Sequence, residues 1–371
     1  MPTPSTRLFP YMFWAQTEAW ASAYSLAVSG MPAPDASLFG DLGPLDLGPA
    51  PVDALPAVRG RLGELFDVNP GRILISSGAS GIMHLLAMRF FPGAHVVTEV
   101  PSYEPFRALS AFYGSSHRIL ERRAAEGFRL PLEQVQGHLA ARGERPGHLF
   151  LCSPHNPTGV ISSPEDLVRL ADLAADAQGI LISNEAYMEF APVGERVHAF
   201  ALAPNAISIG TLTKAYGLGS LRIGWAILGE GLVDQYTSLM DHSYLVSVDP
   251  PTICLRAAKR ALEQLEALLQ PVRQFEQICR PHLQRWLREC PDVEGQLGPL
   301  GLTAFPRILG VEDTHALSKF LAREQEVDAV PGEFFGCPGH LRVGYGVPEA
   351  TLVEGLRRLG LGISAYKRSM G

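Results

Sequence analysis

A single lysine, Lys214, stands in the segment IGTLTKAYGLGSLRIGWA, directly after a strand-like apolar run. Hydroxyl side chains precede it at Thr211 and Thr213, and Arg222 follows eight residues after the lysine. Lys214, the two threonines and Arg222 are within reach of one anion, which such donors can hold together. Burial and nearby cations would lower the pKa of this lysine toward neutrality, which makes its amine a nucleophile.

Two further loops present polar side chains just beyond strand-like runs. In LFLCSPHNPTGV (149–160), two prolines and a glycine make a rigid loop that carries Asn156. In ILISNEAYMEF (180–190), Asn184 lies at the predicted strand end and Tyr187 follows three residues later. Ligands bind open parallel sheets where strands end and loops begin, so we expect these side chains to share one site.

A fourth junction, ILISSGASGIMHLL (73–86), has a turn of small residues before a helix-like run. Gly78, Ala79 and Ser80 would offer free backbone amides and the positive end of the helix dipole to a phosphate. The same run is equally typical of a flexible turn with a helix cap, and both interpretations stay open on this motif alone. SSGASG lacks the full GxGxxG spacing and is followed by no acidic residue at the expected distance, which argues against a nucleotide-binding dehydrogenase.

The elements that must position these residues alternate along the chain. From about residue 73 to 228, amphipathic runs separate short apolar ones: RILIS, HVVTEV, HLFLC, GILIS, AISIG and GWAIL. This alternation predicts an α/β fold with a mainly parallel sheet sandwiched by helices. Residues 252–290 are helical in pattern, with Pro271 and Pro281 punctuating them, and the tail offers a strand, LRVGYG, and a helix, PEATLVEGLRRL. We expect a second, smaller α+β domain there.

Composition narrows the classes of partner. The chain has 371 residues, 46% of them apolar, with a net charge of −7 and a pI near 5.9, so it has no basic field for nucleic acid or anionic lipid. Its five cysteines show no metal-ligand spacing, and their odd number argues against a complete disulfide framework. The stretch LFPYMFWA is a poor signal peptide and too short to span a bilayer. We expect a cytoplasmic protein with reduced thiols, no metal, and no membrane or nucleic-acid partner.

Together these motifs resemble the fold-type I pyridoxal-phosphate enzymes, in particular the class I and II aminotransferases. The resemblance runs from about residue 45 to the C-terminus and depends most on SPHNPTG and on the TLTK segment with its following arginine. It implies pyridoxal 5′-phosphate as the cofactor, with Lys214 forming a Schiff base to the aldehyde and then acting as general base at the substrate Cα. The implied activity transfers the amino group of an L-α-amino acid to a 2-oxo acid.

The resemblance also implies a role for each site residue. Tyr103, in VPSYEPF, would stack on the cofactor ring, and Asn156 and Tyr187 would donate to its phenolic oxygen. Arg342, in LRVGYG, would grip the substrate α-carboxylate with its planar pair of donors. The implied cofactor-binding residues are Gly78, Ala79, Ser80, Tyr103, Asn156, Asn184, Tyr187, Thr211, Thr213, Lys214 and Arg222. The implied substrate-binding residues are Arg342, Asn156 and Gly30, and the implied catalytic residues are Lys214 and Tyr187.

Several of these residues have a plainer structural interpretation. Tyr103 could be a half-buried core tyrosine, and Arg342 could form a structural ion pair. His155 is expected to serve the loop that contains it. The N-terminal aromatic side chains could line a substrate pocket or merely fasten the first helix to the domain, and the second interpretation is favoured; they are Tyr11, Phe13, Trp14 and Tyr24.

Two positions depart from the family pattern. The family has an aspartate at the position of Asn184, which keeps the pyridine nitrogen of the cofactor protonated; asparagine has no charge for this task, although its amide can donate to an unprotonated nitrogen. Glu185 is not expected to substitute, because successive side chains of a strand face opposite ways. Many relatives also have a tyrosine within the region that corresponds to 45–62, which reaches the partner subunit's cofactor phosphate, but here no tyrosine occurs from residue 25 to 102.

Three hypotheses follow, and an aminotransferase with a less activated ring is favoured. The second is a pyridoxal-phosphate lyase, cyclase or oxidase that acts on an amino acid. The third is a catalytically degenerate family member, against which the joint retention of Lys214, Arg222 and Arg342 argues. The resemblance further implies a homodimer with an N-terminal segment over residues 1–44, which covers the active site, a large domain over 45–250 and a small domain over 251–371.

Overall fold

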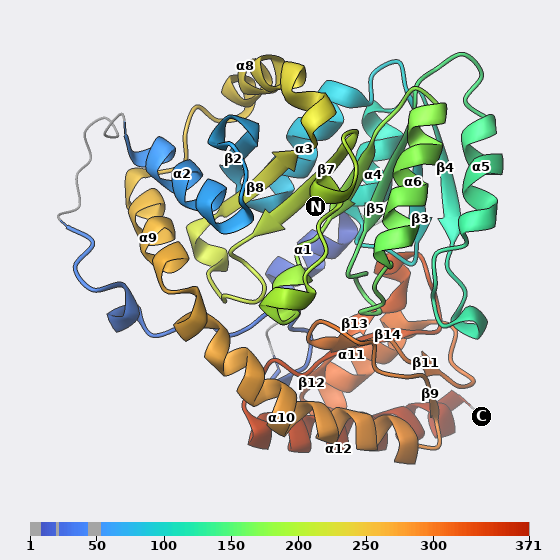
Figure 1. Cartoon of the computed structure of the whole chain (residues 1–371). Helices are drawn as coiled ribbons and strands as arrows, with labels where there is room; N and C mark the ends of the chain where they lie inside the picture. Colours follow the sequence, from blue (N-terminus) through green and yellow to red (C-terminus); the bar gives the residue numbers. More distant parts are fainter. Residues whose placement is uncertain (1–8, 20–21, 44–52, 371) are drawn as a thin grey trace.

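The computed structural model describes residues 9–19, 22–43 and 53–370. Seven strands form one sheet in the order β2-β8-β7-β6-β5-β3-β4 (Figure 1). Their bounds are β2 (Ile73–Ser77), β3 (His95–Val100), β4 (Ser116–Glu121), β5 (Gly147–Cys152), β6 (Leu181–Asn184), β7 (Ala206–Thr211) and β8 (Ile223–Leu228). All neighbours are parallel except β8, which runs antiparallel to both β2 and β7. The predicted α/β fold with a mainly parallel sheet is therefore confirmed.

Helices cover both faces of this sheet because its strands are apolar on both sides. On β5, Phe150 packs among side chains of α3 and α4, whereas its neighbours Leu149 and Leu151 pack against α5 and α6. Such double-sided burial is typical of parallel sheets. The helices of this region are α2 (Ala54–Phe66), α3 (Gly78–Phe90), α4 (Pro105–Tyr113), α5 (Leu132–Ala140), α6 (Pro164–Asp176), α7 (Ala199–Leu202) and α8 (Tyr236–Val246).

The C-terminal part adds helices and three small sheets. In the largest of these, β14 (Leu341–Gly344) lies between β10 (Thr303–Ala304) and β13 (Val330–Pro331), antiparallel to both. The other strands are β9 (Val293–Glu294), which pairs with β11 (Arg307–Ile308), and β12 (Val327–Asp328), which pairs with β1 (Tyr24–Ser25). The helices are α9 (Thr252–Glu263), α10 (Leu265–Glu289), α11 (Thr314–Gln325) and α12 (Glu349–Met370). The domain boundary expected at residue 250 falls between α8 and α9 and stays a prediction.

The two prolines that punctuate the helical pattern of 252–290 both lie inside one helix. Pro271 and Pro281 do not divide the helical region, because α10 runs through both. An interior proline costs a helix about 3 kcal/mol, since it removes a backbone donor and crowds the preceding turn. Here the helix also buries a continuous apolar stripe, which includes Leu268, Leu283 and Leu287. That burial outweighs the local cost.

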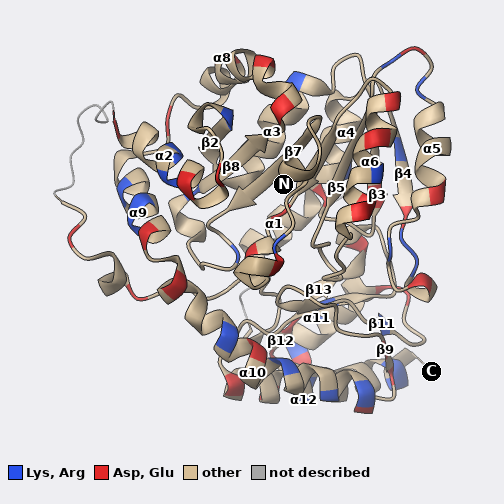
Figure 2. Cartoon of the chain, viewed as in Figure 1, with Lys and Arg blue, Asp and Glu red and all other residues tan. Residues whose placement is uncertain are grey.

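The N-terminal segment reaches from the small sheets to the large one. β1 pairs with β12, and α1 (Pro10–Thr17) lies between the large sheet and the β13–β14 region (Figure 1). Lys and Arg alternate with Asp and Glu along α10 and α12, so these outer helices present no field of one sign (Figure 2). Among the described residues, no helix is long and apolar enough to cross a membrane. Residues 45–52 of the region that lacks the family tyrosine lie outside the described residues.

Candidate active site

Lys214 lies just beyond the end of β7, at the edge of the sheet where parallel strands end. Its amine donates a hydrogen bond to Ser29 Oγ at 3.0 Å and lies 5.7 Å from the centre of the Tyr187 ring. Burial is the main cause that lowers the pKa of this amine to about 8, and the Arg342 and Arg222 guanidiniums lower it as well. A much larger share of the amine is therefore neutral near pH 7 than in an ordinary lysine, and only the neutral form is nucleophilic.

The N-terminus of α3 forms a concave site for an anion. Gly78, the first residue of α3, has a φ of +74°, and no side chain caps the first turn of that helix. Because Ser77 pairs with Ile223 across β2 and β8, Arg222 lies beside this helix end, where its Nη2 donates to the Ser77 carbonyl at 3.2 Å. A Cβ at position 78 would lie 2.5 Å from that Nη2. Free amides, the helix dipole and a guanidinium thus converge on one point, as a phosphate requires.

The other residues expected around the phosphate lie nearby, but not all of their hydroxyl groups are free to donate a hydrogen bond to it. Ala79 and Ser80 are in the first turn of α3, and the Ser80 side chain is exposed. The Thr211 and Thr213 hydroxyls are 2.9 Å apart, and Thr211 Oγ1 donates to the Ile223 carbonyl at 3.1 Å. The Thr211 proton is therefore committed to the backbone of β8, which the sequence did not indicate.

Asn184 ends β6 and is almost fully buried, with 5% of its surface exposed. Its amide oxygen accepts the Ala186 backbone N–H at 3.1 Å, and its amide nitrogen donates to the Met83 sulfur at 3.2 Å. The oxygen is thus held by the chain itself, whereas the nitrogen has only a weak acceptor. Glu185 faces the other side of the strand, as alternation predicts, where it bonds His198 and Ser208.

Tyr187 has a buried hydroxyl that forms no hydrogen bond of ordinary geometry with a described residue, although the Ser29 side chain lies close enough to act on it. Burial is also the main cause that raises the pKa of this phenol, so it stays protonated and able to donate. A buried polar group without a partner costs about 1–3 kcal/mol, and native proteins rarely leave one unless a ligand or water completes it. The phenolic oxygen of pyridoxal phosphate is an acceptor of the kind that this hydroxyl lacks.

Arg342, on β14, is almost completely buried at 1% exposure, and it forms no ion pair with any described residue. Its Nη1 donates to Asn156 Oδ1 at 3.4 Å, and its Nη2 donates to Tyr11 Oη at 3.1 Å and to the Ala27 carbonyl at 3.0 Å. Its Nε has no partner within the described part of the chain. Desolvating a cation without an anion is costly, so this arrangement suits an anionic ligand better than a purely structural role.

Asn156 is held by a loop with its own internal support. His155 bonds the Pro101 carbonyl through Nε2 and the Thr158 hydroxyl through Nδ1, both at 2.7 Å, which agrees with the expectation that this histidine serves the loop. The fully buried Glu99 lies beneath, where it accepts the Cys152 backbone N–H at 2.8 Å. This support explains how a polar loop stays ordered within the interior.

Tyr103 and Gly30 lie at the border of the site. The Tyr103 ring meets the Tyr11 ring edge-on at 5.9 Å between centroids, and its hydroxyl donates to the Met12 sulfur at 3.4 Å. A Cβ at Gly30 would lie 3.1 Å from the Lys214 carbonyl, so the N-terminal segment passes directly against the lysine. Of these neighbours, sequence reasoning missed the contact of Tyr11 with Arg342, and the only signal for it was the aromatic N-terminal stretch.

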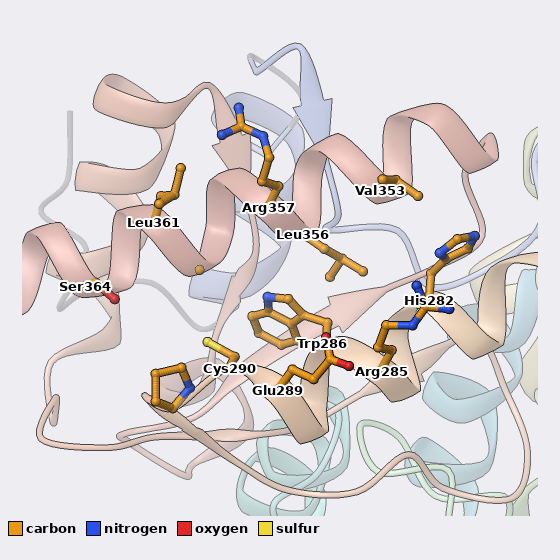
Figure 3. A pocket seen from close by; sticks show the side chains of 12 residues that line it. His282, Arg285, Trp286, Glu289, Cys290, Val353, Leu356, Arg357, Leu361 and Ser364 are labelled. Carbon is orange, nitrogen blue, oxygen red and sulfur yellow. The ribbon is translucent and has the colours of Figure 1, made fainter.

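Two cavities lie apart from Lys214. One, of about 440 Å³, lies between α10 and α12 and is lined by Trp286, Cys290 and Leu356 among others (Figure 3). The other, of about 910 Å³, borders the loop after Asn156 and includes His340 in its lining. Neither cavity is lined by Lys214, Arg222 or Arg342, so neither is part of the candidate active site.

Comparison with known proteins identifies the family of the chain. The family described as aminotransferase class I and II matches residues 47–359. Capreomycidine synthase from Streptomyces vinaceus is 30% identical to the chain over 351 residues, which are 91% of this chain and 85% of that protein. Aspartate aminotransferase from Streptomyces avermitilis is 27% identical over 316 residues, or 79% of this chain and 74% of that protein. A PLP-dependent aminotransferase structure from Streptococcus suis has a TM-score of 0.84 at 21% identity, covering 96% of this chain and 98% of that one.

The chain therefore belongs to the aminotransferase class I and II family, whose members are fold-type I enzymes that depend on pyridoxal phosphate. The expectations of this family, of its cofactor and of an enzyme of the aminotransferase type are confirmed. The residues present also fit the cofactor: an anion cradle at α3, a nucleophilic amine and an unpartnered phenol lie around one region.

Proposed function

We propose that the protein transfers the amino group of an L-α-amino acid to a 2-oxo acid, with pyridoxal phosphate bonded to Lys214. The observation that carries this proposal is the buried Lys214 amine, whose pKa is lowered to about 8, between two guanidiniums that pair with no described carboxylate. Two anions fit this arrangement: a cofactor phosphate beside Arg222 and a substrate carboxylate beside Arg342.

In this proposal, the chain holds the cofactor at three places. The backbone amides of Gly78, Ala79 and Ser80 and the Arg222 guanidinium bind the phosphate, with Thr213 beside it. Tyr103 covers one face of the ring, and Tyr187 and Asn156 donate to the phenolic oxygen. When bound, the cofactor supplies an aldehyde for the amine and a ring that withdraws electrons from the substrate Cα.

The proton at Cα is moved by Lys214 once its amine is free. A general base works best when its pKa lies near the working pH, and burial brings the Lys214 pKa to about 8. Arg342 and Asn156 fix the carboxylate, so the remaining Cα bonds keep one orientation relative to the amine. Tyr187, whose ring centre lies 5.7 Å from the Lys214 Nζ, excludes water from the amine and holds it in place.

A second candidate function is supported by Asn184 and by one of the relatives. A neutral amide donor stabilises an unprotonated pyridine and so gives a weaker electron sink than an aspartate would. Elimination, replacement, cyclisation or oxidation at the amino acid could then compete with amino transfer. The similarity to a protein named capreomycidine synthase, at 30% identity, supports keeping this alternative beside the first.

We also propose a cytoplasmic homodimer. Apolar side chains gather without cover at the end of α8, where Tyr244, Leu245 and Val248 expose 54%, 80% and 68% of their surface. Exposed apolar side chains that form a large patch mark interfaces, so we propose that this segment lies at the subunit interface. Sedimentation at micromolar concentration tests it, and a monomer would count against a site completed by a partner subunit.

Trapping the bond to Lys214 tests the central assignment. Purified protein given pyridoxal phosphate should develop a visible band that shifts with added amino acids, and borohydride should fix the cofactor to the peptide that contains residue 214. Lys214→Ala should abolish both results, whereas Lys319→Ala, which removes an exposed lysine on α11, should change neither. A band that survives Lys214→Ala would refute the assignment. Products then separate the candidates: a 2-oxo acid with aminated cofactor means amino transfer, whereas ammonia or peroxide means a lyase or an oxidase.

A further inference from the structure

We infer that Tyr11, on the N-terminal helix α1, is a substrate-binding residue whose hydroxyl donates the final hydrogen bond to the substrate carboxylate held by Arg342. This inference rests on the proposed function, because it assumes that an amino acid binds between Lys214 and Arg342. It assigns to the N-terminal segment a direct part in binding, where the sequence favoured simple attachment of the first helix.

The hydrogen bonds around Arg342 leave the Tyr11 proton unused. Tyr11 Oη accepts from the Arg342 Nη2 at 3.1 Å, and it donates to no residue that the structure describes. Only 8% of the surface of Tyr11 is exposed, so water does not readily accept that hydrogen bond. A buried phenol that accepts from a guanidinium therefore directs its own O–H toward whatever anion the guanidinium binds.

The position of the phenol is fixed from two sides. The Tyr11 backbone N–H donates to the Glu104 carboxylate at 2.9 Å, which ties the first turn of α1 to the start of α4. The ring packs against Trp14 at 6.3 Å and against Phe334 at 5.6 Å between centroids. A side chain held in this way has little rotational entropy left to lose when a ligand arrives, so its hydrogen bond contributes nearly in full.

The place of the hydroxyl also matches a substrate. The Tyr11 hydroxyl is bonded to Arg342 and also lies near enough to the Lys214 amine to act on it electrostatically. Tyr103, the residue expected over the cofactor ring, meets the Tyr11 ring at 5.9 Å. A carboxylate bound by the Arg342 Nη2 would therefore lie within reach of the Tyr11 hydroxyl.

The test compares Tyr11→Phe with the wild type in the cofactor-loaded protein. Phenylalanine keeps the ring contacts and removes only the hydroxyl. The probes are 2-aminoisobutyrate, which has no proton on Cα and therefore binds without reacting further, and isopropylamine, which has the same carbon skeleton without the carboxylate. Binding is followed by absorbance titration, and the ratio of initial slopes gives the ratio of affinities even below saturation.

The expected result is about a tenfold or greater loss of affinity for 2-aminoisobutyrate, since one charge-assisted bond is lost, with no change for isopropylamine. Tyr24→Phe is the matched control, because Tyr24 lies in the same N-terminal segment but contacts Arg358, 4.4 Å from its ring centre. The inference is overturned if Tyr11→Phe binds both probes as the wild type does, or if it weakens both equally, which would mean a packing role. A wild type that answers to neither probe, although borohydride fixes the cofactor to Lys214, would refute the amino-acid site beside Arg342 and the inference with it; absence of the borohydride-fixed bond would refute the cofactor assignment.

Discussion

Replacing Asn184 by aspartate places a carboxylate at a buried position whose surroundings are known atom by atom. The Ala186 N–H still has its acceptor, but the second carboxylate oxygen faces the Met83 sulfur in place of the present donor contact at 3.2 Å. A buried ionised oxygen without a donor costs about 3 kcal/mol, and burial raises its pKa. We therefore expect the cofactor-free Asn184→Asp protein to lose about 2–3 kcal/mol of unfolding free energy.

Loading the cofactor should reverse this loss. A protonated pyridine nitrogen gives the new carboxylate a charge-assisted partner worth about 1.5–3 kcal/mol, which asparagine cannot match. Pyridoxal phosphate should then bind the variant about 30-fold more tightly than it binds the wild type, because ~2 kcal/mol corresponds to that ratio. The rate of Cα deprotonation should rise as well, since the ring becomes a stronger electron sink.

The assay is chemical unfolding with and without cofactor, together with cofactor titration by absorbance. Asn205→Asp serves as the control, because Asn205 is a partly buried asparagine whose amide nitrogen donates to the Ala171 carbonyl at 2.8 Å, and it precedes β7 whereas Lys214 follows that strand. It should lower the stability of the cofactor-free protein and leave cofactor affinity unchanged. If Asn184→Asp gains no affinity over Asn205→Asp, the side chain at 184 does not face the ring nitrogen, and the argument for a weaker electron sink fails.

Three further outcomes are expected. When cofactor-free protein is given pyridoxal phosphate and trapped with borohydride, the rate of labelling at Lys214 should rise with pH toward about 8 and level off above it, because only the neutral amine reacts. A rate that continues to rise to pH ~10 would contradict the lowered pKa. Gly78→Ala should weaken pyridoxal phosphate binding about tenfold by displacing Arg222, whereas Gly93→Ala, with a similar φ of +78° and nothing within 4 Å, should cost only stability. Burial raises the pKa of Glu104 to about 7, so the stability that this group contributes is full below its unfolded pKa of about 4.5 and is lost as pH rises through 7. The thermal unfolding temperature of the wild type should therefore fall relative to that of Glu104→Gln between about pH 5 and 8. Unfolding temperatures that change with pH in the same way for both proteins would refute the shift.

Local patterns predicted the parts of the fold that local physics controls. Apolar runs bounded by turns became β2, β3, β5, β6, β7 and β8, whereas the largely exposed edge strand β4 was not predicted. Asn184 ends β6, and the loops after β5 and β7 carry Asn156 and Lys214. The antiparallel direction of β8 was not predictable, because an apolar run does not indicate whether its strand is parallel or antiparallel to its neighbours. That α10 continues through Pro271 and Pro281 was not predictable for a related reason: the tertiary burial that outweighs a proline involves residues distant along the chain.

The candidate site shows the same division. Arg222 could be placed beside Gly78 only through the family resemblance, because strand pairing between β2 and β8 brings them together across more than a hundred residues. The contact of Tyr11 with Arg342 spans 331 positions and has no local signature. The sequence indicates the chemistry of each side chain, and only the structure shows which hydroxyl, carbonyl and amide groups contact it.

The three cations of the site lack carboxylate partners among the described residues, so the site is suited to bind anionic ligands. Lys214, Arg222 and Arg342 have hydroxyl, carbonyl and amide oxygens as partners among the described residues, and none of them forms an ion pair there. A protein with a net charge of −7 has many carboxylates that could have been placed beside them. Leaving these cations uncompensated lowers stability, and anionic ligands that bind only the folded state restore it by mass action. Arg222 lies at the α3 end, Arg342 lies beside Tyr11, and both act on the Lys214 amine. In the proposed function, the charges that attract two anions would therefore also fix which substrate bond faces the base.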